Sequence, residues 1–201
     1  MQILYHEKPV PYITINNYYN NEELSLIWQE LNFLTHQTKL ESPYKTGLTD
    51  QQSTAKRNHG VFLDSIYSRR ELSNILTLSR KIYNFDLINY ACSQHIIFNY
   101  LKFSKRDGTL LSYYEDTGQY LPHTDQSILT TVTWLYKEPK KFDGGDFFFS
   151  DYGYQIPIQN NMIILFPSFV EHSVSEIKMD RFSKPFSGEG RYSITNFITP
   201  F

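Results

Sequence analysis

The chain has 201 residues and a formal net charge of −2, with 19 Lys and Arg against 21 Asp and Glu. Its basic residues are scattered rather than clustered, which argues against binding to nucleic acid or to an anionic membrane surface. Cys92 is the single cysteine, so an internal disulfide and a cysteine-based zinc site are excluded and a reducing compartment is favoured.

The length is typical of one domain, and no linker rich in Pro, Gly or Ser divides the chain. We therefore expect a single domain over residues 1–201. The 16 Tyr and 15 Phe supply bulky core side chains that suit β-rich packing. The first residues lack the pattern of a signal peptide, and no apolar run approaches ~20 residues, so we expect a cytoplasmic protein.

We expect the first 93 residues to form a mainly helical region that packs on the rest of the domain. "VPYITIN" predicts a short strand, and "NNEELSLIWQELNFL" predicts a helix with apolar residues at helical spacing. Asn20 and Glu23 form a candidate N-cap pair for this helix. The polar stretch from His36 to His59 predicts a long loop. A second helix is expected to begin at Ser68, where "SRRE" has the pattern of a capping box.

After about residue 94 the sequence changes to short β-branched and aromatic runs, which predict about seven strands. Asp107-Gly108 is a hairpin turn signal between the first two of them. Closely spaced strands of this kind indicate a sandwich, a barrel or a jelly roll. The predicted runs are "QHIIFNYLKFS", "TLLSYYED", "SILTTVTWLY", "GDFFFSD", "NMIILFPS", "HSVSEI" and "RYSITNFIT".

One His is followed two positions later by an Asp, in the stretch "YLPHTDQS". Side chains two apart on a strand share a face, so His123 and Asp125 can hold one ion from one side. Imidazole and carboxylate together suit Fe(II), Mn(II) or Zn(II). A surface His beside a solvated Asp is the alternative. His172, after an apolar strand, is the best-placed third ligand, while a partly buried strand histidine is its ordinary role.

The final strand places Arg191 and Ser193 on one face. An inward guanidinium beside a hydroxyl suits bidentate capture of a ligand carboxylate. An exposed edge-strand Arg paired with Glu189 or Asp180 is the alternative.

In this order, His123-x-Asp125, His172 and Arg191-x-Ser193 resemble the prolyl 4-hydroxylase-like branch of the iron(II)- and 2-oxoglutarate-dependent dioxygenases. The resemblance covers residues 94–201 through "YYEDTGQYLPHTD", "FDGGDFFF", "FPSFVEHSVSEI" and "GRYSITNFI". It implies an α+β, mainly β fold, in which helices of residues 1–93 pack on a double-stranded β-helix, a cupin-like jelly roll. It also implies iron held by His123, Asp125 and His172, and 2-oxoglutarate held by Arg191 and Ser193.

The resemblance carries further positions into the predicted pocket. Tyr120 matches a Tyr that precedes the metal His, and either Tyr113 or Tyr114 matches a strand Tyr that reaches the cosubstrate; strand alternation permits only one of these two. Gly144-Gly145 matches a tight turn, and Val174 and Phe197 would line the pocket. Trp134 departs from the family, in which a Tyr hydroxyl is frequent, because an indole offers only one N–H donor.

The implied reaction is hydroxylation of a C–H bond with O2, in which 2-oxoglutarate is converted to succinate and CO2. Ascorbate is a candidate reductant. Asp125 fills the coordination position that a halide would need, which favours hydroxylation over halogenation. The family branch suggests a prolyl or other residue of a protein or peptide as substrate, and a free amino acid or another small molecule is the alternative.

Two other functions share part of this pattern. Nucleic-acid demethylases of the superfamily carry a second Arg six residues after the first, where this chain has Phe197. A cupin-like binding module with a vestigial metal site is the non-enzymatic alternative, against which the complete ligand set argues. Finally, the stretches 35–60 and 180–190 predict loops near the pocket, and we expect the first to order over the substrate.

Overall fold

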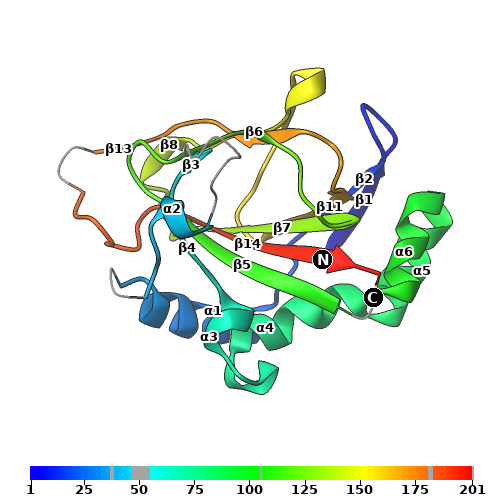
Figure 1. Cartoon of the computed structure of the whole chain (residues 1–201), viewed down its shortest axis with the longest axis horizontal. Helices are drawn as coiled ribbons and strands as arrows, with labels where there is room; N and C mark the ends of the chain where they lie inside the picture. The colour runs from blue at the N-terminus through cyan, green and yellow to red at the C-terminus, as the bar shows by residue number, and fades with distance from the viewer. Residues whose placement is uncertain (37–38, 47–54, 105, 181–182, 201) are drawn as a thin grey trace.

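Two antiparallel β-sheets face each other in this computed structural model, and helices cover the outer side of the larger sheet (Figure 1). The structure describes residues 1–36, 39–46, 55–104, 106–180 and 183–200. The larger sheet has seven strands, in the spatial order β1 (Gln2–His6), β2 (Tyr12–Asn16), β11 (Met162–Pro167), β7 (Leu129–Leu135), β14 (Arg191–Thr199), β5 (Arg106–Tyr114) and β4 (His59–Phe62).

The smaller sheet has five strands and lies over the inner face of the larger one. Their order is β10 (Tyr154–Ile156), β9 (Phe147–Phe149), β12 (His172–Val174), β6 (Gln119–His123) and β3 (Lys56–Arg57). A separate two-stranded ribbon pairs β13 (Ile177–Met179) with β8 (Phe142–Gly144). This antiparallel sandwich agrees with the predicted jelly roll.

The helices and turns come mostly before β5 in the chain. The α-helices are α1 (Asn21–Leu34), α2 (Pro43–Thr46), α3 (Leu63–Ile66), α4 (Asn74–Ser79), α5 (Phe85–Gln94) and α6 (Tyr100–Phe103). The 3-10 helices are η1 (Arg70–Leu72), η2 (Arg80–Tyr83), η3 (Ile96–Asn99) and η4 (Ser150–Tyr152). Within the described ranges, no helix is long and apolar enough to cross a membrane.

Strand alternation gives the larger sheet two buried faces with different roles. On β14, Tyr192 and Ile194 pack into the core shared with the helices, whereas Arg191 and Ser193 line the space between the sheets. Because successive side chains on a strand point to opposite faces, one strand serves both layers. The helical layer thus packs on the outer face of the larger sheet, and the inner face lines the space between the two sheets.

Helix α1 forms as its sequence predicts. The Asn20 side chain accepts from the backbone N–H of Glu23 at 2.9 Å, and the Glu23 carboxylate accepts from the N–H of Asn20 at 2.8 Å. This reciprocal pair satisfies two N–H groups that have no partner inside the helix. Ile27, Leu31 and Leu34 then bury their side chains completely against the sheet.

One helix prediction and one strand prediction were wrong. The second helix does not begin at Ser68, because Ser73 caps α4 by accepting from the N–H of Leu76 at 3.0 Å. The run 94–104 is not a strand, since it folds as η3 and α6. Phe98 and Leu101 are buried three residues apart while Ile96 is exposed, so packing follows a helical period despite the β-branched composition.

The predicted hairpin turn at Asp107-Gly108 was also wrong. Both residues lie inside β5, where Asp107 pairs with Ile198 and Gly108 with Phe197 of β14. The strand β5 and the next strand in the chain, β6, belong to different sheets. The chain crosses from one sheet to the other between them, which is how His123 comes to face the interior.

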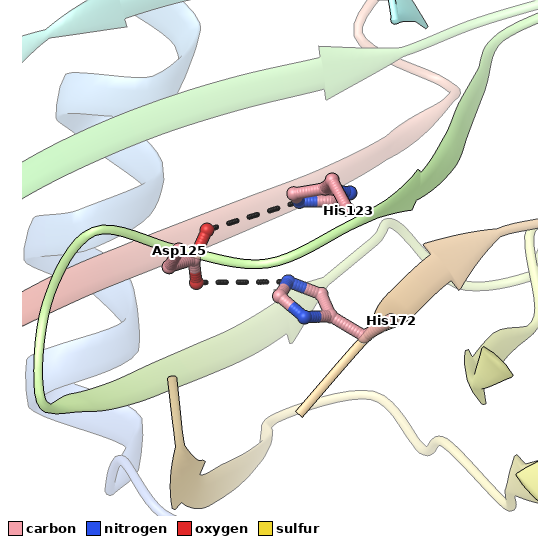
Figure 2. A group of neighbouring side chains, drawn as sticks. All are labelled: His123, Asp125 and His172. Carbon is pink, nitrogen blue, oxygen red and sulfur yellow. Dashed lines mark ion pairs between the residues drawn. The ribbon is translucent and has the colours of Figure 1, made fainter. Parts of the chain in front are cut away.

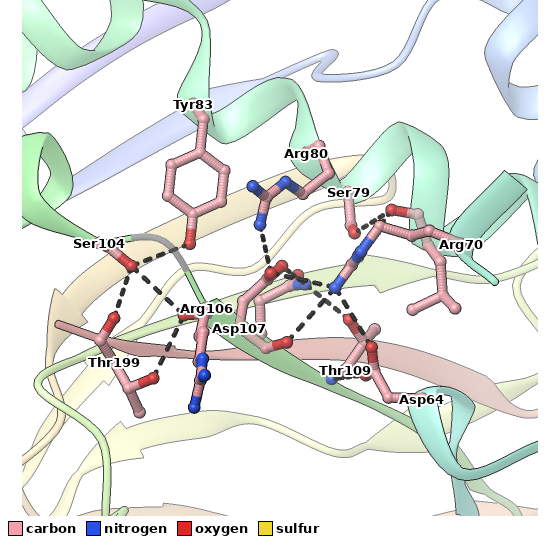
Figure 3. Close-up of polar contacts among 12 residues, drawn as sticks. Asp64, Arg70, Ser79, Arg80, Tyr83, Ser104, Arg106, Asp107, Thr109 and Thr199 are labelled. Atoms are coloured by element: carbon pink, nitrogen blue, oxygen red, sulfur yellow. Dashed lines mark hydrogen bonds and ion pairs between the residues drawn. The ribbon is translucent and has the colours of Figure 1, made fainter. Parts of the chain in front are cut away.

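The Asp107 carboxylate instead fastens the helical layer to the end of the sheet (Figure 3). Its side chain is 1% exposed and accepts from Arg70 at 3.0 Å and from Arg80 in a short contact. Arg70 also pairs with Asp64, whose other oxygen accepts from the N–H of Thr109 at 2.6 Å. In this network each buried charge has an opposite charge beside it, which offsets the cost of burial.

Candidate functional site

The pairing of β12 with β6 sets two histidines directly opposite each other, with His172 in register with His123. Their ring centroids lie 4.2 Å apart. Side chains of paired residues share one face of a sheet, so both rings point between the sheets. One strand pair thereby brings together two histidines that lie 49 positions apart in the sequence.

Asp125 follows the end of β6 and turns its carboxylate toward both rings (Figure 2). Its two oxygens lie 3.8 Å from Nε2 of His123 and 3.6 Å from Nε2 of His172. The backbone N–H of Asp125 donates to Ser168 O at 3.0 Å, and the Thr130 hydroxyl donates to the carboxylate at 2.6 Å. These bonds fix the orientation of the carboxylate before any ligand binds.

Each imidazole is held in one tautomer. Nδ1 of His123 lies 2.9 Å from Leu121 O, and Nδ1 of His172 lies 2.9 Å from Val170 O. A carbonyl oxygen only accepts, so Nδ1 carries the proton and Nε2 keeps its lone pair toward Asp125. Both His residues therefore present the form that coordinates a metal.

Electrostatics favour the same form. Burial, followed by the neighbouring His172, lowers the pKa of His123 to about 3. Burial also lowers the pKa of His172, although the Asp125 carboxylate acts in the opposite direction. Neutral imidazoles bind a divalent cation without first losing a proton.

The three side chains fit a metal ion. Their ligand atoms all lie within 4.8 Å of one another, close enough for one ion to contact all three after small side-chain movements. Two imidazoles and one carboxylate on one side of the ion form the 2-His-1-carboxylate donor set of non-haem Fe(II) sites, which leaves positions open for ligands. The predicted grouping of His123, Asp125 and His172 is thus present in the fold.

Arg191 lies on the inner face of the larger sheet and is completely buried. One Nη1 donates in a short hydrogen bond to Gly145 O, and the guanidinium carbon lies 4.8 Å from the centre of the Tyr114 ring. Nε and Nη2 have no hydrogen-bond partner among the described residues. Burial lowers the pKa of Arg191 to about 10, so the group stays charged at neutral pH while two of its three nitrogens have no acceptor among the described residues.

Arg191 and the three candidate ligands line one cavity between the sheets. Ser193 lies two positions after Arg191 on β14 and opposite Trp134 on β7. The indole N–H of Trp134 is buried and also has no partner among the described residues. The lining comprises Thr46, Phe62, Leu110, Ser112, Tyr114, Tyr120, His123, Asp125, Val132, Trp134, Phe147, His172, Val174, Arg191, Ser193, Thr195 and Phe197.

The choice between the two adjacent tyrosines is settled by strand alternation. Tyr114 lines the cavity. Tyr113 points to the helical side, where its hydroxyl accepts from the N–H groups of Gly188 and Gly190 at 3.0 and 3.2 Å. The inclusion of Tyr113 among the pocket residues was therefore a misplacement, whereas Tyr120 lines the cavity and stacks on His123 at 3.5 Å between centroids.

The predicted tight turn at Gly144-Gly145 positions the guanidinium. Both residues have a positive φ, of 69° and 71°, which L side chains rarely adopt. A Cβ on Gly145 would lie 3.3 Å from Nη1 of Arg191. Glycine therefore lets the backbone carbonyl come close enough to accept from the arginine.

Sequence reasoning missed several buried polar residues near the site. Thr130 orients Asp125, and its position in an alternating strand was the available signal. Lys56 and Asn58 lie in a stretch without any period, where no pattern marks them. Residues 47–54, within the stretch expected to order over the substrate, lie outside the described residues, as do residues 181 and 182 of the second predicted loop.

Comparison with known proteins connects this geometry with a family. Residues 109–199 match the model of the 2OG-Fe(II) oxygenase superfamily, which confirms the resemblance found in the sequence. The matched segment contains all three candidate metal ligands and Arg191. No curated protein sequence matches the chain.

Solved structures confirm the predicted jelly-roll fold. A prolyl-4-hydroxylase from Pseudomonas putida is 14% identical with a TM-score of 0.62, covering 94% of this chain and 92% of its own. A prolyl hydroxylase from Trichoplax adhaerens, in complex with a hypoxia inducible factor oxygen degradation domain peptide fragment, is 15% identical with a TM-score of 0.64, covering 94% and 83%. The viral collagen prolyl hydroxylase of Paramecium Bursaria Chlorella virus-1 is 12% identical with a TM-score of 0.56, covering 93% and 94%.

Proposed function

We propose that this protein is an Fe(II)- and 2-oxoglutarate-dependent dioxygenase that hydroxylates a C–H bond, most closely in the manner of a prolyl hydroxylase. One observation carries the proposal: a completely buried Arg191 with unused donors lies on the same cavity as His123, Asp125 and His172. A metal-binding group alone would suit many reactions. The added guanidinium specifies a ligand that also carries a carboxylate.

His123, Asp125 and His172 would hold Fe(II) on one side and leave the cavity side open. With 2-oxoglutarate and O2, the bound metal supplies oxidative decarboxylation to succinate and CO2, and the second oxygen atom enters the substrate C–H bond as a hydroxyl group. The hydrogen bonds from the two Nδ1 atoms and from Thr130 keep the three ligand atoms oriented. Their role is positioning before the reaction begins.

Arg191 would receive the distal carboxylate of 2-oxoglutarate through Nε and Nη2, the two nitrogens that bond to no described residue. Ser193 offers a hydroxyl on the same face, and the Trp134 indole N–H offers a further donor from the neighbouring strand. The apolar side chains of Val132, Phe147 and Val174 would keep water from the space between the metal ligands and Arg191.

For the substrate, we propose a prolyl or other residue of a protein or peptide. The Trichoplax adhaerens prolyl hydroxylase, similar in fold, was solved with a peptide fragment, which supports this class. A free amino acid would require the same chemistry at the metal. Phe197 lines the cavity and faces Phe62 at 6.3 Å, so its ring contributes no charge for a nucleic-acid backbone.

The test is conversion of labelled 2-oxoglutarate to succinate, combined with proteome-wide mass spectrometry for a gain of one oxygen atom. We expect wild-type protein with Fe(II) to form succinate and to add oxygen to specific residues of a cell extract, while His172→Ala does neither. Wild-type turnover by a folded His172→Ala variant would contradict the metal assignment. Succinate formation with no modified polypeptide would move the substrate to the small-molecule class.

A further inference from the structure

The short strand β3 brings a second cation to the inner side of the small sheet. Lys56 pairs with Tyr120 in the β3–β6 register, and paired residues present their side chains to the same face. Tyr120 lines the cavity. Lys56 is only 1% exposed, and its ammonium has no hydrogen-bond partner among the described residues.

The residues after Lys56 show that strand alternation sets its inward orientation. Arg57 is exposed, whereas Asn58 is buried, as alternation requires. The Asn58 amide lies near the Tyr114 hydroxyl, and neither of its polar atoms makes a well-formed hydrogen bond to any residue that the structure describes. Positions 56 and 58 therefore present two underused polar groups to the interior.

The ammonium of Lys56 lies close to the candidate metal ligands. Its Nζ is 5.3 Å from the centre of the Tyr120 ring, which stacks in turn on His123 at 3.5 Å. Burial lowers the pKa of Lys56 to about 8, and the Asp125 carboxylate acts against that shift. In the metal-free protein the ammonium is therefore still mostly protonated at neutral pH.

Among the described residues, the charges expected at the site leave Lys56 without a counter-ion. The two positive charges of Fe(II) and the one of Arg191 are matched by Asp125 and the two carboxylates of 2-oxoglutarate. Asp146 also acts on Arg191, but it is only half-buried and water screens it. A buried charge in excess is unfavourable, so the complete site calls for one further anion next to Lys56.

We propose that Lys56 binds a carboxylate of the substrate beside the metal centre. The substrate is then an acid, either through an acidic side chain or through a terminal carboxylate close to the hydroxylated carbon. This assignment rests on the proposed dioxygenase function, since it counts the charges of Fe(II) and 2-oxoglutarate. The competing role is binding of the cosubstrate itself, and the experiment separates the two.

The experiment follows the lysine signals directly. Protein labelled with carbon-13 at lysine Cε is loaded with Zn(II), then with 2-oxoglutarate, and titrated with acetate as the carboxylate probe; Lys56→Met assigns the resonance. Calorimetry measures 2-oxoglutarate and acetate affinities in parallel. Arg57→Met is the matched control, because it removes the adjacent but exposed charge. Should Lys56→Met not fold, Lys56→Gln replaces it.

We expect the Lys56 signal to shift saturably with acetate in the 2-oxoglutarate complex. Acetate affinity should fall about 10- to 100-fold in Lys56→Met and stay unchanged in Arg57→Met, with 2-oxoglutarate affinity constant in both. A Lys56 signal that responds to 2-oxoglutarate and no further to acetate overturns the proposal in favour of cosubstrate binding. No response to either ligand also overturns it.

Failure of the proposed function has a different signature. In that case wild-type protein would not bind 2-oxoglutarate at all, with or without Zn(II). If acetate still bound at Lys56 in that case, Lys56 would be an anion site. Its assignment to the substrate would be overturned, because the charges of Fe(II) and 2-oxoglutarate would no longer apply.

Discussion

Two polar clusters lie at different places in the larger sheet, and they differ in how their charges are satisfied. At the start of β5, the buried carboxylate of Asp107 contacts both Arg70 and Arg80 (Figure 3). Between the sheets, Arg191 and Trp134 keep buried donors that no described residue uses. Buried polar groups are normally paired. A cluster that is complete indicates a structural role, whereas unused donors indicate a ligand.

The largest expected effect comes from removing a metal ligand. Asp125→Ala should abolish metal binding and reduce succinate formation by roughly 1,000-fold or more, because two imidazoles alone hold Fe(II) weakly. Iron content after desalting and succinate yield measure the effect, with Asp151→Ala as the exposed control. An active, iron-loaded Asp125→Ala variant would refute the ligand assignment.

Arg191→Met should come next. The substitution removes a charge-assisted fork to a carboxylate, worth roughly 2–4 kcal/mol, or about 30- to 1,000-fold in 2-oxoglutarate affinity. Because a buried unpaired charge is replaced by an apolar chain, the fold should be retained. Calorimetry on Zn(II)-loaded protein provides the measurement, and Zn(II) affinity should not change. Equal 2-oxoglutarate affinity in both proteins would remove Arg191 from the cosubstrate site.

At the cluster around Asp107 we expect a loss of stability without a loss of cosubstrate binding. Asp107→Asn leaves Arg70 and Arg80 without a full counter-charge and should lower the free energy of unfolding by about 2–3 kcal/mol, with 2-oxoglutarate affinity unchanged. Urea denaturation compares it with Glu41→Gln, which breaks only an exposed pair with Lys45 and should cost less than about 1 kcal/mol. If Asp107→Asn kept its stability but bound 2-oxoglutarate more weakly, the structural role of this cluster would be contradicted.

A smaller effect sharpens the role of the indole. Trp134→Phe keeps a ring against Phe147 but removes the N–H donor, and should weaken 2-oxoglutarate about 5- to 10-fold. Trp28→Phe is the matched control, because Trp28 packs on Tyr192 on the helical side of the sheet. Identical affinities in Trp134→Phe and wild type would show that the indole N–H bonds no part of the cosubstrate.

The last effect concerns the pH dependence of stability in the metal-free protein. The pKa of Lys56 is lowered to about 8 in the folded state, while the unfolded value is about 10.5. Between these values the unfolded chain binds more protons, so this residue makes stability rise with pH. Lys56→Met should therefore be more stable than wild type at pH 7, and the difference should shrink by pH 10. A constant difference across that range would mean that Lys56 titrates normally.

The sequence predicted the parts of the molecule that depend on local spacing. Asn20 and Glu23 identify the start of α1 because capping involves residues three apart, and the alternation in "RYSITNFI" places Arg191 and Ser193 on one face. Alternation also required that only one of Tyr113 and Tyr114 face the cavity, although it gave no means to choose between them. The packing of Tyr113 against the helical layer makes that choice.

Errors and omissions arose where tertiary contacts override local preference. Asp107-Gly108 has the composition of a turn, yet β5 continues through it because β14 pairs along its whole length and two arginines take the carboxylate. Ile96 and Ile97 favour a strand, yet burial of Phe98 and Leu101 selects helical turns. Lys56 was missed because its two-residue strand exists only by pairing with β6.

The most direct test of the central claim is the visible spectrum of the protein under anaerobic conditions as Fe(II) and then 2-oxoglutarate are added. The account predicts a weak charge-transfer band that appears only with both additions and saturates at one equivalent of iron. Asp125→Ala should lack the band, and Arg191→Met should require more 2-oxoglutarate to reach it. Absence of the band in a folded wild-type protein that binds Fe(II) would contradict the assignment of this cavity to iron and 2-oxoglutarate.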